Sequence, residues 1–145
     1  MTDGPIPVVD KCEEWDGPVP EPTGLTAEFW SETANGRFLV QQCPNCDHQQ
    51  FYPRIVCTNC GREEPDWTDT SGDGEIYSFT ICYTAREEAF QKLTPYVVAI
   101  VELEDGPQLT ALVPADPDEI TIGTPVEMRL WQVDDDAALP VFYPV

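Results

Sequence analysis

Basic residues are scarce in this sequence. Its 145 residues contain 7 Lys and Arg together against 27 Asp and Glu, which gives a net charge of −20. Such a charge repels nucleic acids and anionic membrane surfaces, and so argues against both as partners. It also destabilises a compact fold by self-repulsion unless counterions screen it. We therefore expect a source with concentrated intracellular salt; the alternative is an ordinary acidic protein with basic partners.

Long apolar runs are missing as well. No stretch of 18 apolar residues could form a transmembrane helix, and no basic, apolar leader opens the chain. These observations favour a cytoplasmic protein.

The residues that usually carry catalysis are few. The single histidine, His48, lies between cysteines, so no Ser/His/Asp or Cys/His set can be assembled without it. The phosphate-binding glycine motifs of nucleotide enzymes are absent from the sequence. Cys82 lies between Ile81 and Tyr83, and we interpret it as a packed core residue. The inventory favours a binding or scaffold protein over an enzyme.

Two Cys-x-x-Cys pairs are the most specific motif present. Cys43 and Cys46 form the first pair, and Cys57 and Cys60 form the second after a gap of ten residues. Each pair can present two sulfurs to one ion, and four thiolates are the tetrahedral set that structural Zn²⁺ prefers. A closed Cys₄ site leaves no open coordination position, so the metal is expected to be structural. Gly61 supplies the tolerance of positive φ that such a turn often needs.

The four cysteines also allow other interpretations. Two disulfides or four buried free thiols would fit the count, but no secretory signal points to an oxidising compartment. Iron fits an S₄ tetrahedron as well as zinc does, so the identity of the metal stays open. His48 could compete as a ligand; with four cysteines in register, we expect it at the surface or beside the ligands.

The composition divides the chain into three parts. Residues 1–24 are rich in proline and glycine, which predicts an extended arm that a partner could order. Trp15 within it is either an anchor for that partner or a contact with the chain's own surface. Residues 25–66 would form an N-terminal helix and the metal-binding ribbon, and residues 67–145 a β domain.

Beyond Trp67 the sequence pattern predicts a series of short β-strands. Apolar residues alternate from Glu75 to Arg86, with Tyr77, Phe79, Ile81 and Tyr83 expected on one face. Further strands are expected at 96–104, 108–113, 126–133 and 139–143. Short strands without interleaved long helices suggest a small closed barrel, and an OB-fold matches the size. The predicted class is mainly β: a short helix from Leu25 to Asn35, a zinc ribbon, then an OB-fold barrel.

An ordered series of motifs resembles the DUF35 family over residues 25–145. The series runs through Phe29-Trp30, Gly36-Arg37, the four cysteines, Tyr52-Pro53-Arg54, Gly72-x-Gly74-x-Ile76-Tyr77-Ser78-Phe79-Thr80, Pro95-Tyr96-Val97-Val98-Ala99, Gly123-x-Pro125-Val126 and Leu139-Pro140-Val141-Phe142. The resemblance implies a rubredoxin-like zinc ribbon and an OB-fold, with Cys43, Cys46, Cys57 and Cys60 at the positions of the metal ligands. Together with the charge, it suggests a haloarchaeal source.

The resemblance also implies a function. It points to a non-catalytic partner of a thiolase, an acyl-CoA synthase or a lipid-transfer-type aldolase, one that helps form the site for CoA or acyl-CoA. Arg54 matches the family's position after proline, although only one proline precedes it here where two are common. It is our candidate contact for CoA, and a hydrogen-bonding strut within the ribbon is the alternative. A stand-alone zinc-ribbon/OB-fold protein that binds single-stranded nucleic acid is the alternative function.

Overall fold

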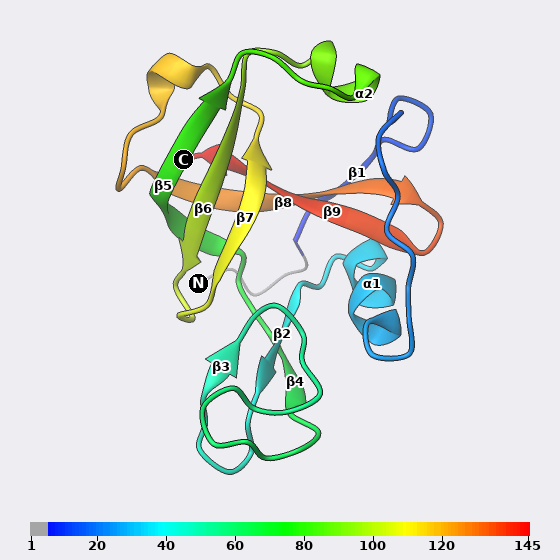
Figure 1. Ribbon diagram of the computed structural model, residues 1–145, viewed down its shortest axis with the longest axis vertical. Helices are drawn as coiled ribbons and strands as arrows, with labels where there is room; N and C mark the ends of the chain where they lie inside the picture. Colours follow the sequence, from blue (N-terminus) through cyan, green and yellow to red (C-terminus); the bar gives the residue numbers. More distant parts are fainter. Residues whose placement is uncertain (1–5) are drawn as a thin grey trace.

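Five strands in the C-terminal part of the chain form a closed, OB-like barrel. A computed structural model describes residues 6–145, and Figure 1 shows the barrel above a smaller, cysteine-containing lobe. The strand order is β8-β5-β6-β7-β9, and β8 pairs again with β9 to close the ring. The strands are β5 (Asp73–Cys82), β6 (Tyr96–Leu103), β7 (Gln108–Val113), β8 (Pro125–Asp134) and β9 (Ala137–Pro144).

Every second side chain along the strands points into the barrel and fills its interior. On β6, Val97, Val101 and Leu103 are buried in the barrel, whereas Ile100 on the opposite face is 36% exposed, although the nearly continuous apolar run predicts burial on both faces. Gly74 lies where β5 pairs with both β6 and β8. A Cβ added there would stand 2.6 Å from the carbonyl oxygen of Glu102, so the two backbones can approach this closely only at a glycine.

The aromatic face predicted for β5 does not persist. The pairing of β5 with β6 shifts register between Ile76 and Ser78. Tyr77 consequently turns to solvent and is 56% exposed, whereas Phe79 and Ile81 pack against the core. A bulge of this kind redirects every side chain before it relative to those after it.

The smaller lobe contains a helix and a three-stranded sheet. The helix α1 (Ala27–Ala34) is shorter than expected, and the side chain of Thr26 makes no capping hydrogen bond. The sheet has the order β3-β2-β4. Its strands are β2 (Leu39–Gln42), β3 (Gln49–Gln50) and β4 (Asp66–Asp69). The backbone N–H of Ala138 on β9 donates to the hydroxyl of Thr33, which fixes α1 to the barrel.

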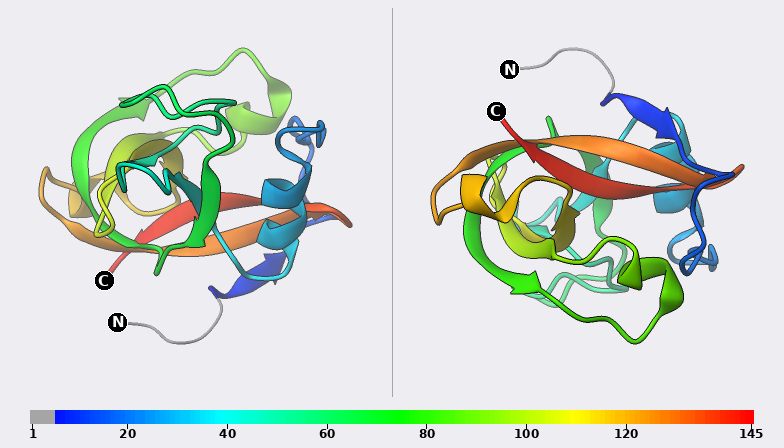
Figure 2. Two further views of the ribbon diagram at one scale, coloured as in Figure 1. Left: turned by 90° about the horizontal axis from the view of Figure 1, so that it is seen from below. Right: turned by 90° about the horizontal axis from the view of Figure 1, so that it is seen from above.

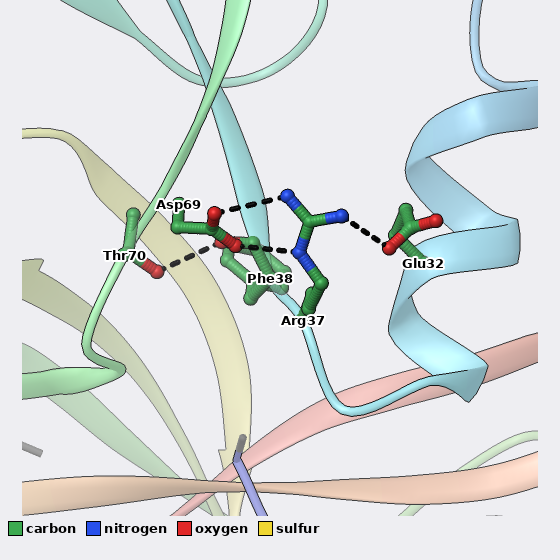
Figure 3. A network of polar contacts seen from close by, with 5 residues as sticks. All are labelled: Glu32, Arg37, Phe38, Asp69 and Thr70. Atoms are coloured by element: carbon green, nitrogen blue, oxygen red, sulfur yellow. Dashed lines mark hydrogen bonds and ion pairs between the residues drawn. The ribbon is translucent and has the colours of Figure 1, made fainter. Parts of the chain in front are cut away.

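One arginine links the helix to the ribbon sheet. The guanidinium of Arg37 donates to both carboxylate oxygens of Asp69 at 2.9 Å and to Glu32 at 2.7 Å (Figure 3). The Arg37 guanidinium lowers the pKa of the Asp69 carboxyl below its usual range by this hydrogen bonding. Beside it, the hydroxyl of Thr70 donates to the carbonyl of Phe38. These contacts join α1, the start of β2 and the end of β4.

The described part of the arm, residues 6–24, packs on the chain's own barrel. Ile6 is buried, and β1 (Val8–Asp10) pairs in parallel with β8. Both views of Figure 2 show β1 beside the β8–β9 hairpin. Trp15 contacts Phe90 and Trp131 edge-on, so the second of the two roles weighed for it, contact with the chain's own surface, is the one observed.

Two short helical segments complete the fold. They are α2 (Glu88–Gln91) and the 3₁₀ turn at Pro117–Glu119. Among residues 6–145, no helix combines the length and apolar character needed to cross a lipid bilayer.

Candidate metal centre

The two cysteine pairs meet at one point of the ribbon. The four sulfurs of Cys43, Cys46, Cys57 and Cys60 all lie within 4.8 Å of one another. The closest pairs join Cys43 to Cys60 at 3.5 Å and Cys46 to Cys57 at 3.6 Å. Tetrahedral zinc with Zn–S bonds of about 2.3 Å would separate its sulfurs by about 3.8 Å. The arrangement is that of a closed tetrathiolate metal site.

Each pair forms the same tight turn. The N–H of Asp47 donates to the carbonyl of Cys43, and the N–H of Gly61 donates to the carbonyl of Cys57, both at 2.9 Å. Both donor residues have positive φ, 62° at Asp47 and 82° at Gly61. The use expected for Gly61 is therefore confirmed. Asp47 adopts the same left-handed conformation in the first turn, because aspartate tolerates this region better than most residues.

Hydrogen bonds favour the thiolate form at the two more accessible cysteines. The backbone N–H of Arg62 and the side-chain amide of Asn45 lower the pKa of Cys60 to about 6. The side-chain amide of Asn59 lowers the pKa of Cys46. At Cys43, burial raises the pKa to about 11. Because a metal binds thiolates, the hydrogen bonds to Cys46 and Cys60 favour the form of these side chains that a metal needs.

None of the six cysteines, all of which lie in the described residues, forms a disulfide. His48 stands outside the sulfur cluster, and its Nε2 lies 3.1 Å from the hydroxyl of Thr58. Its carbonyl accepts the N–H of Cys43, so its contribution to the site is a backbone bond. Cys82 lies on β5, away from the ribbon cysteines, and is only partly buried.

Two buried glutamines, which sequence reasoning missed, position the loop between the cysteine pairs. The side-chain amide of Gln41 both accepts from the N–H of Arg54 and donates to its carbonyl, each at 2.8 Å. Gln50 donates to Gln41 and accepts from the N–H and hydroxyl of Thr58. These bonds hold the backbone of Arg54 firmly and leave its side chain exposed. Buried polar groups satisfied in this way specify one loop conformation.

Comparisons with known proteins agree with this architecture. Residues 30–66 match a family model described as the rubredoxin-like zinc ribbon domain of ChsH2, and residues 67–130 match its C-terminal OB-fold domain. A DUF35 domain-containing scaffold protein of Methanothermobacter thermautotrophicus is 40% identical over 97 residues, which are 66% of this chain and 72% of that protein. The chain belongs to the DUF35 family. These matches confirm the predicted fold, and the structure groups the four cysteines as predicted.

One relative is much longer than this chain. A protein named as a probable enoyl-CoA hydratase alpha subunit, from Thermomonospora curvata, is 40% identical over 118 residues. The match takes in 80% of this DUF35 chain and 36% of that protein, so the chain spans about a third of its length.

Solved structures show the same fold. A chain of the structure titled "Ltp2-ChsH2(DUF35) aldolase" superposes with a TM-score of 0.76 at 31% identity, over 87% of this chain and 98% of that one. A DUF35 protein of unknown function from Sulfolobus solfataricus superposes with a TM-score of 0.62 at 12% identity, over 86% and 87% of the two chains.

Proposed function

We propose that this DUF35 chain is a non-catalytic accessory subunit of an enzyme complex that processes acyl-CoA, such as a thiolase, a hydratase or an aldolase. The observation that carries the proposal is the match to nearly the whole DUF35 chain in the Ltp2–ChsH2 aldolase structure. The scaffold names of the archaeal relatives and the hydratase-subunit name of the longer one agree with it. In this proposal the catalytic residues lie on the partner chain.

The proposal assigns a task to each part of the chain. Residues 25–66, with the helix and most of the ribbon, and residues 67–145, with the end of the ribbon strand β4 and the barrel, form the scaffold, and residues 1–24 form the arm. Cys43, Cys46, Cys57 and Cys60 hold one structural Zn²⁺, because four thiolates without an open position suit zinc; iron would occupy the same site. The ion would fix the ribbon that presents the loop carrying Arg54.

Co-purification tests this function. We expect the tagged chain, captured from native extract at high salt, to recover a thiolase-, hydratase- or aldolase-like enzyme. Stripping this chain from the complex should abolish the enzyme's activity, and adding it back should restore it. Recovery of the chain alone, or an enzyme whose activity is indifferent to the chain, would contradict the proposal.

Arg54 is proposed as a contact for the phosphates of CoA. Its side chain is exposed, and among the described residues it enters no ion pair, whereas Lys11, Arg37, Lys92 and Arg129 are each paired with acids. A guanidinium offers forked donors that suit phosphate oxygens. In a chain of net charge −20, such an unpaired cation on a held loop is a suitable phosphate contact.

The Arg54→Ala variant should weaken CoA binding by the reconstituted complex by about tenfold or more, since hydrogen bonds to charged groups contribute about 1.5–3 kcal/mol. Arg62→Ala is the matched control, because Arg62 is also exposed and enters no ion pair among the described residues. Calorimetric titration with CoA measures both variants. Equal losses in the two would show that Arg54 acts only through general charge.

The alternative of a stand-alone protein for single-stranded nucleic acid is not retained. Single-strand binders line their grooves with cations. Within the barrel strands here, the single basic residue is Arg129, and its guanidinium is already paired with Glu127.

A further inference from the structure

The two cysteine turns of the ribbon are near copies of each other. Residues 43–46 read Cys-Pro-Asn-Cys and residues 57–60 read Cys-Thr-Asn-Cys, so asparagine occupies the third place in both. In each turn the N–H of the first cysteine donates to a carbonyl beyond the second, that of His48 at 2.9 Å and that of Arg62 at 2.8 Å. The chain has three asparagines in all, and two of them therefore occupy equivalent places around one site.

Each of these asparagines reaches across to the opposite turn. The side-chain amide of Asn45 donates to the sulfur of Cys60 over an N···S distance of 3.7 Å. The side-chain amide of Asn59 donates to the sulfur of Cys46 over 3.5 Å. Among residues 6–145, these amides are the two side-chain N–H groups that donate to a sulfur. Each turn thus holds the last cysteine of the other turn.

The sulfurs that receive these bonds belong to the cysteines that are more open to solvent. Cys43 and Cys57 are 1% and 2% exposed, whereas Cys46 is partly buried and Cys60 is exposed. Burial therefore shields one cysteine of each turn, and water and competing ligands reach the site at the other. The two asparagine amides lie on the side of the site that burial leaves open.

A neutral amide suits this place in a strongly acidic chain. Four thiolates outweigh the charge of one divalent ion, and the chain itself has a net charge of −20. Aspartate, which has nearly the same shape as asparagine, would put another negative charge beside a thiolate and repel it. Hydrogen bonds to an ionised acceptor are stronger than those between neutral groups. The amides therefore stabilise the thiolates without the lysine or arginine side chains that this chain has in small number.

We propose that Asn45 and Asn59 form a reciprocal latch that governs how tightly, and for how long, the ribbon retains its metal. They are positioning residues, because each holds a solvent-facing sulfur of the opposite turn in the ligand set. Replacing a group that hydrogen-bonds to a metal ligand typically lowers metal affinity by about 10–100-fold. The inference rests on the metal site of the proposed function and deepens it, but it requires neither a partner enzyme nor CoA.

Metal competition on the full-length chain tests the latch. Asn45→Ala, Asn59→Ala and the double variant are loaded with Zn²⁺ at molar KCl and titrated with a chromophoric chelator. Each single variant should lose about tenfold in affinity, and the double variant should lose more, because both bonds act on one site. Release of the ion to excess chelator should become faster in the same order. Asn35→Ala is the matched control and should behave as the parent, because Asn35 is exposed at the end of α1.

A variant of the same shape separates the hydrogen bond from the bulk of the side chain. Asn59→Asp replaces the amide donor by a carboxylate, so it should lose at least as much affinity as Asn59→Ala. Cobalt(II) adds a spectroscopic readout, because a tetrathiolate site gives it tetrahedral bands and a sulfur-to-metal charge-transfer band. Hydrogen bonds to the sulfurs tune the electronic properties of such a site. The charge-transfer band should move to longer wavelength in both Asn59 variants and stay in place in Asn35→Ala.

The tetrahedral cobalt bands also show whether all four sulfurs still bind, so a weakened latch is distinguished from an unfolded ribbon. Unchanged affinity, release rate and charge-transfer band in the double alanine variant would overturn the latch and leave the metal site in place. A loss at only one of the two asparagines would refute its reciprocal character. Parent-like affinity in Asn59→Asp would show that the side chain acts by its shape alone. A parent chain that binds no metal would overturn the metal site of the proposed function as well, so the two failures can be told apart.

Discussion

Replacing one cluster cysteine, as in Cys43→Ser, should unfold the ribbon in the full-length chain. The ribbon beyond β2 has little core of its own: β3 has two residues, and the buried side chains from residue 43 to 62 are Cys43, Gln50 and Cys57. Small modules with so few buried apolar groups need a metal to fold. In zinc-finger peptides the ion contributes about 10–16 kcal/mol, so we expect the structure around residues 43–62 to be lost rather than weakened.

Hydrogen exchange measures this loss directly. The N–H groups of Cys43, Cys57 and Gly61 are all hydrogen-bonded within the ribbon, and their protection should disappear in Cys43→Ser and after chelation. Cys12→Ser is the control, because Cys12 is exposed and outside the sulfur cluster. It should retain one metal ion per chain and full protection. Persistent protection of the ribbon after complete metal removal would contradict a structural role, and elemental analysis of the native protein decides between zinc and iron.

The parts of the fold that the sequence predicts well have a local signal. The spacing of Cys43, Cys46, Cys57 and Cys60 is sufficient to indicate a shared site, because each pair closes its own turn. The sequence of β6 is a nearly continuous apolar run, that of β7 is apolar at alternate positions, and the turn at Gly106 between them has positive φ. Both strands lie within a residue of their expected bounds. In these stretches local preference and tertiary packing agree.

The parts that escaped prediction depend on distant residues. Strand β3 is too short to show a period, and the four residues of β4 carry no clear strand pattern; both strands are recognised only by their pairing with β2. The bulge after Ile76 has no sequence signature, so the exposure of Tyr77 could not be foreseen. Gln41 and Gln50 look like ordinary polar residues, and only their burial against the Arg54 loop reveals their role.

An apolar groove where the arm, the ribbon lobe and the barrel meet shows the same limit of sequence-based prediction. Trp15 and Leu139 are more than 120 residues apart in the 145-residue chain, and no local pattern relates them. They line one groove because β1 pairs with β8 and because β7 and β9 separate beyond Leu112. The arm was expected as an extended segment that a partner could order; in the structure it packs against the barrel and forms part of the wall of this groove.

Stability should depend steeply on salt concentration. The chain has a net charge of −20, and most of its 27 acids remain unpaired among the described residues, where ion pairs involve five acids: Glu14, Asp16, Glu32, Asp69 and Glu127. The screening length falls from about 10 Å at 0.1 M salt to about 3 Å at 1 M. We therefore expect the metal-loaded chain to be folded at molar KCl and to lose its structure cooperatively when KCl is lowered to about 0.1 M.

A charge variant separates screening from other effects of salt. Asp134, Asp135 and Asp136 are consecutive, exposed residues at the β8–β9 turn. Changing all three to Asn reduces the net charge from −20 to −17 and should lower the KCl concentration needed for half-maximal folding, because self-repulsion falls with the charge. The triple change to Glu keeps the charge and should leave that concentration unchanged. Circular dichroism during salt titration measures all three proteins. If the parent is fully stable at low salt, or if the Asn and Glu variants behave alike, then self-repulsion does not govern the stability of this chain, and the expectation of a high-salt source loses its physical basis.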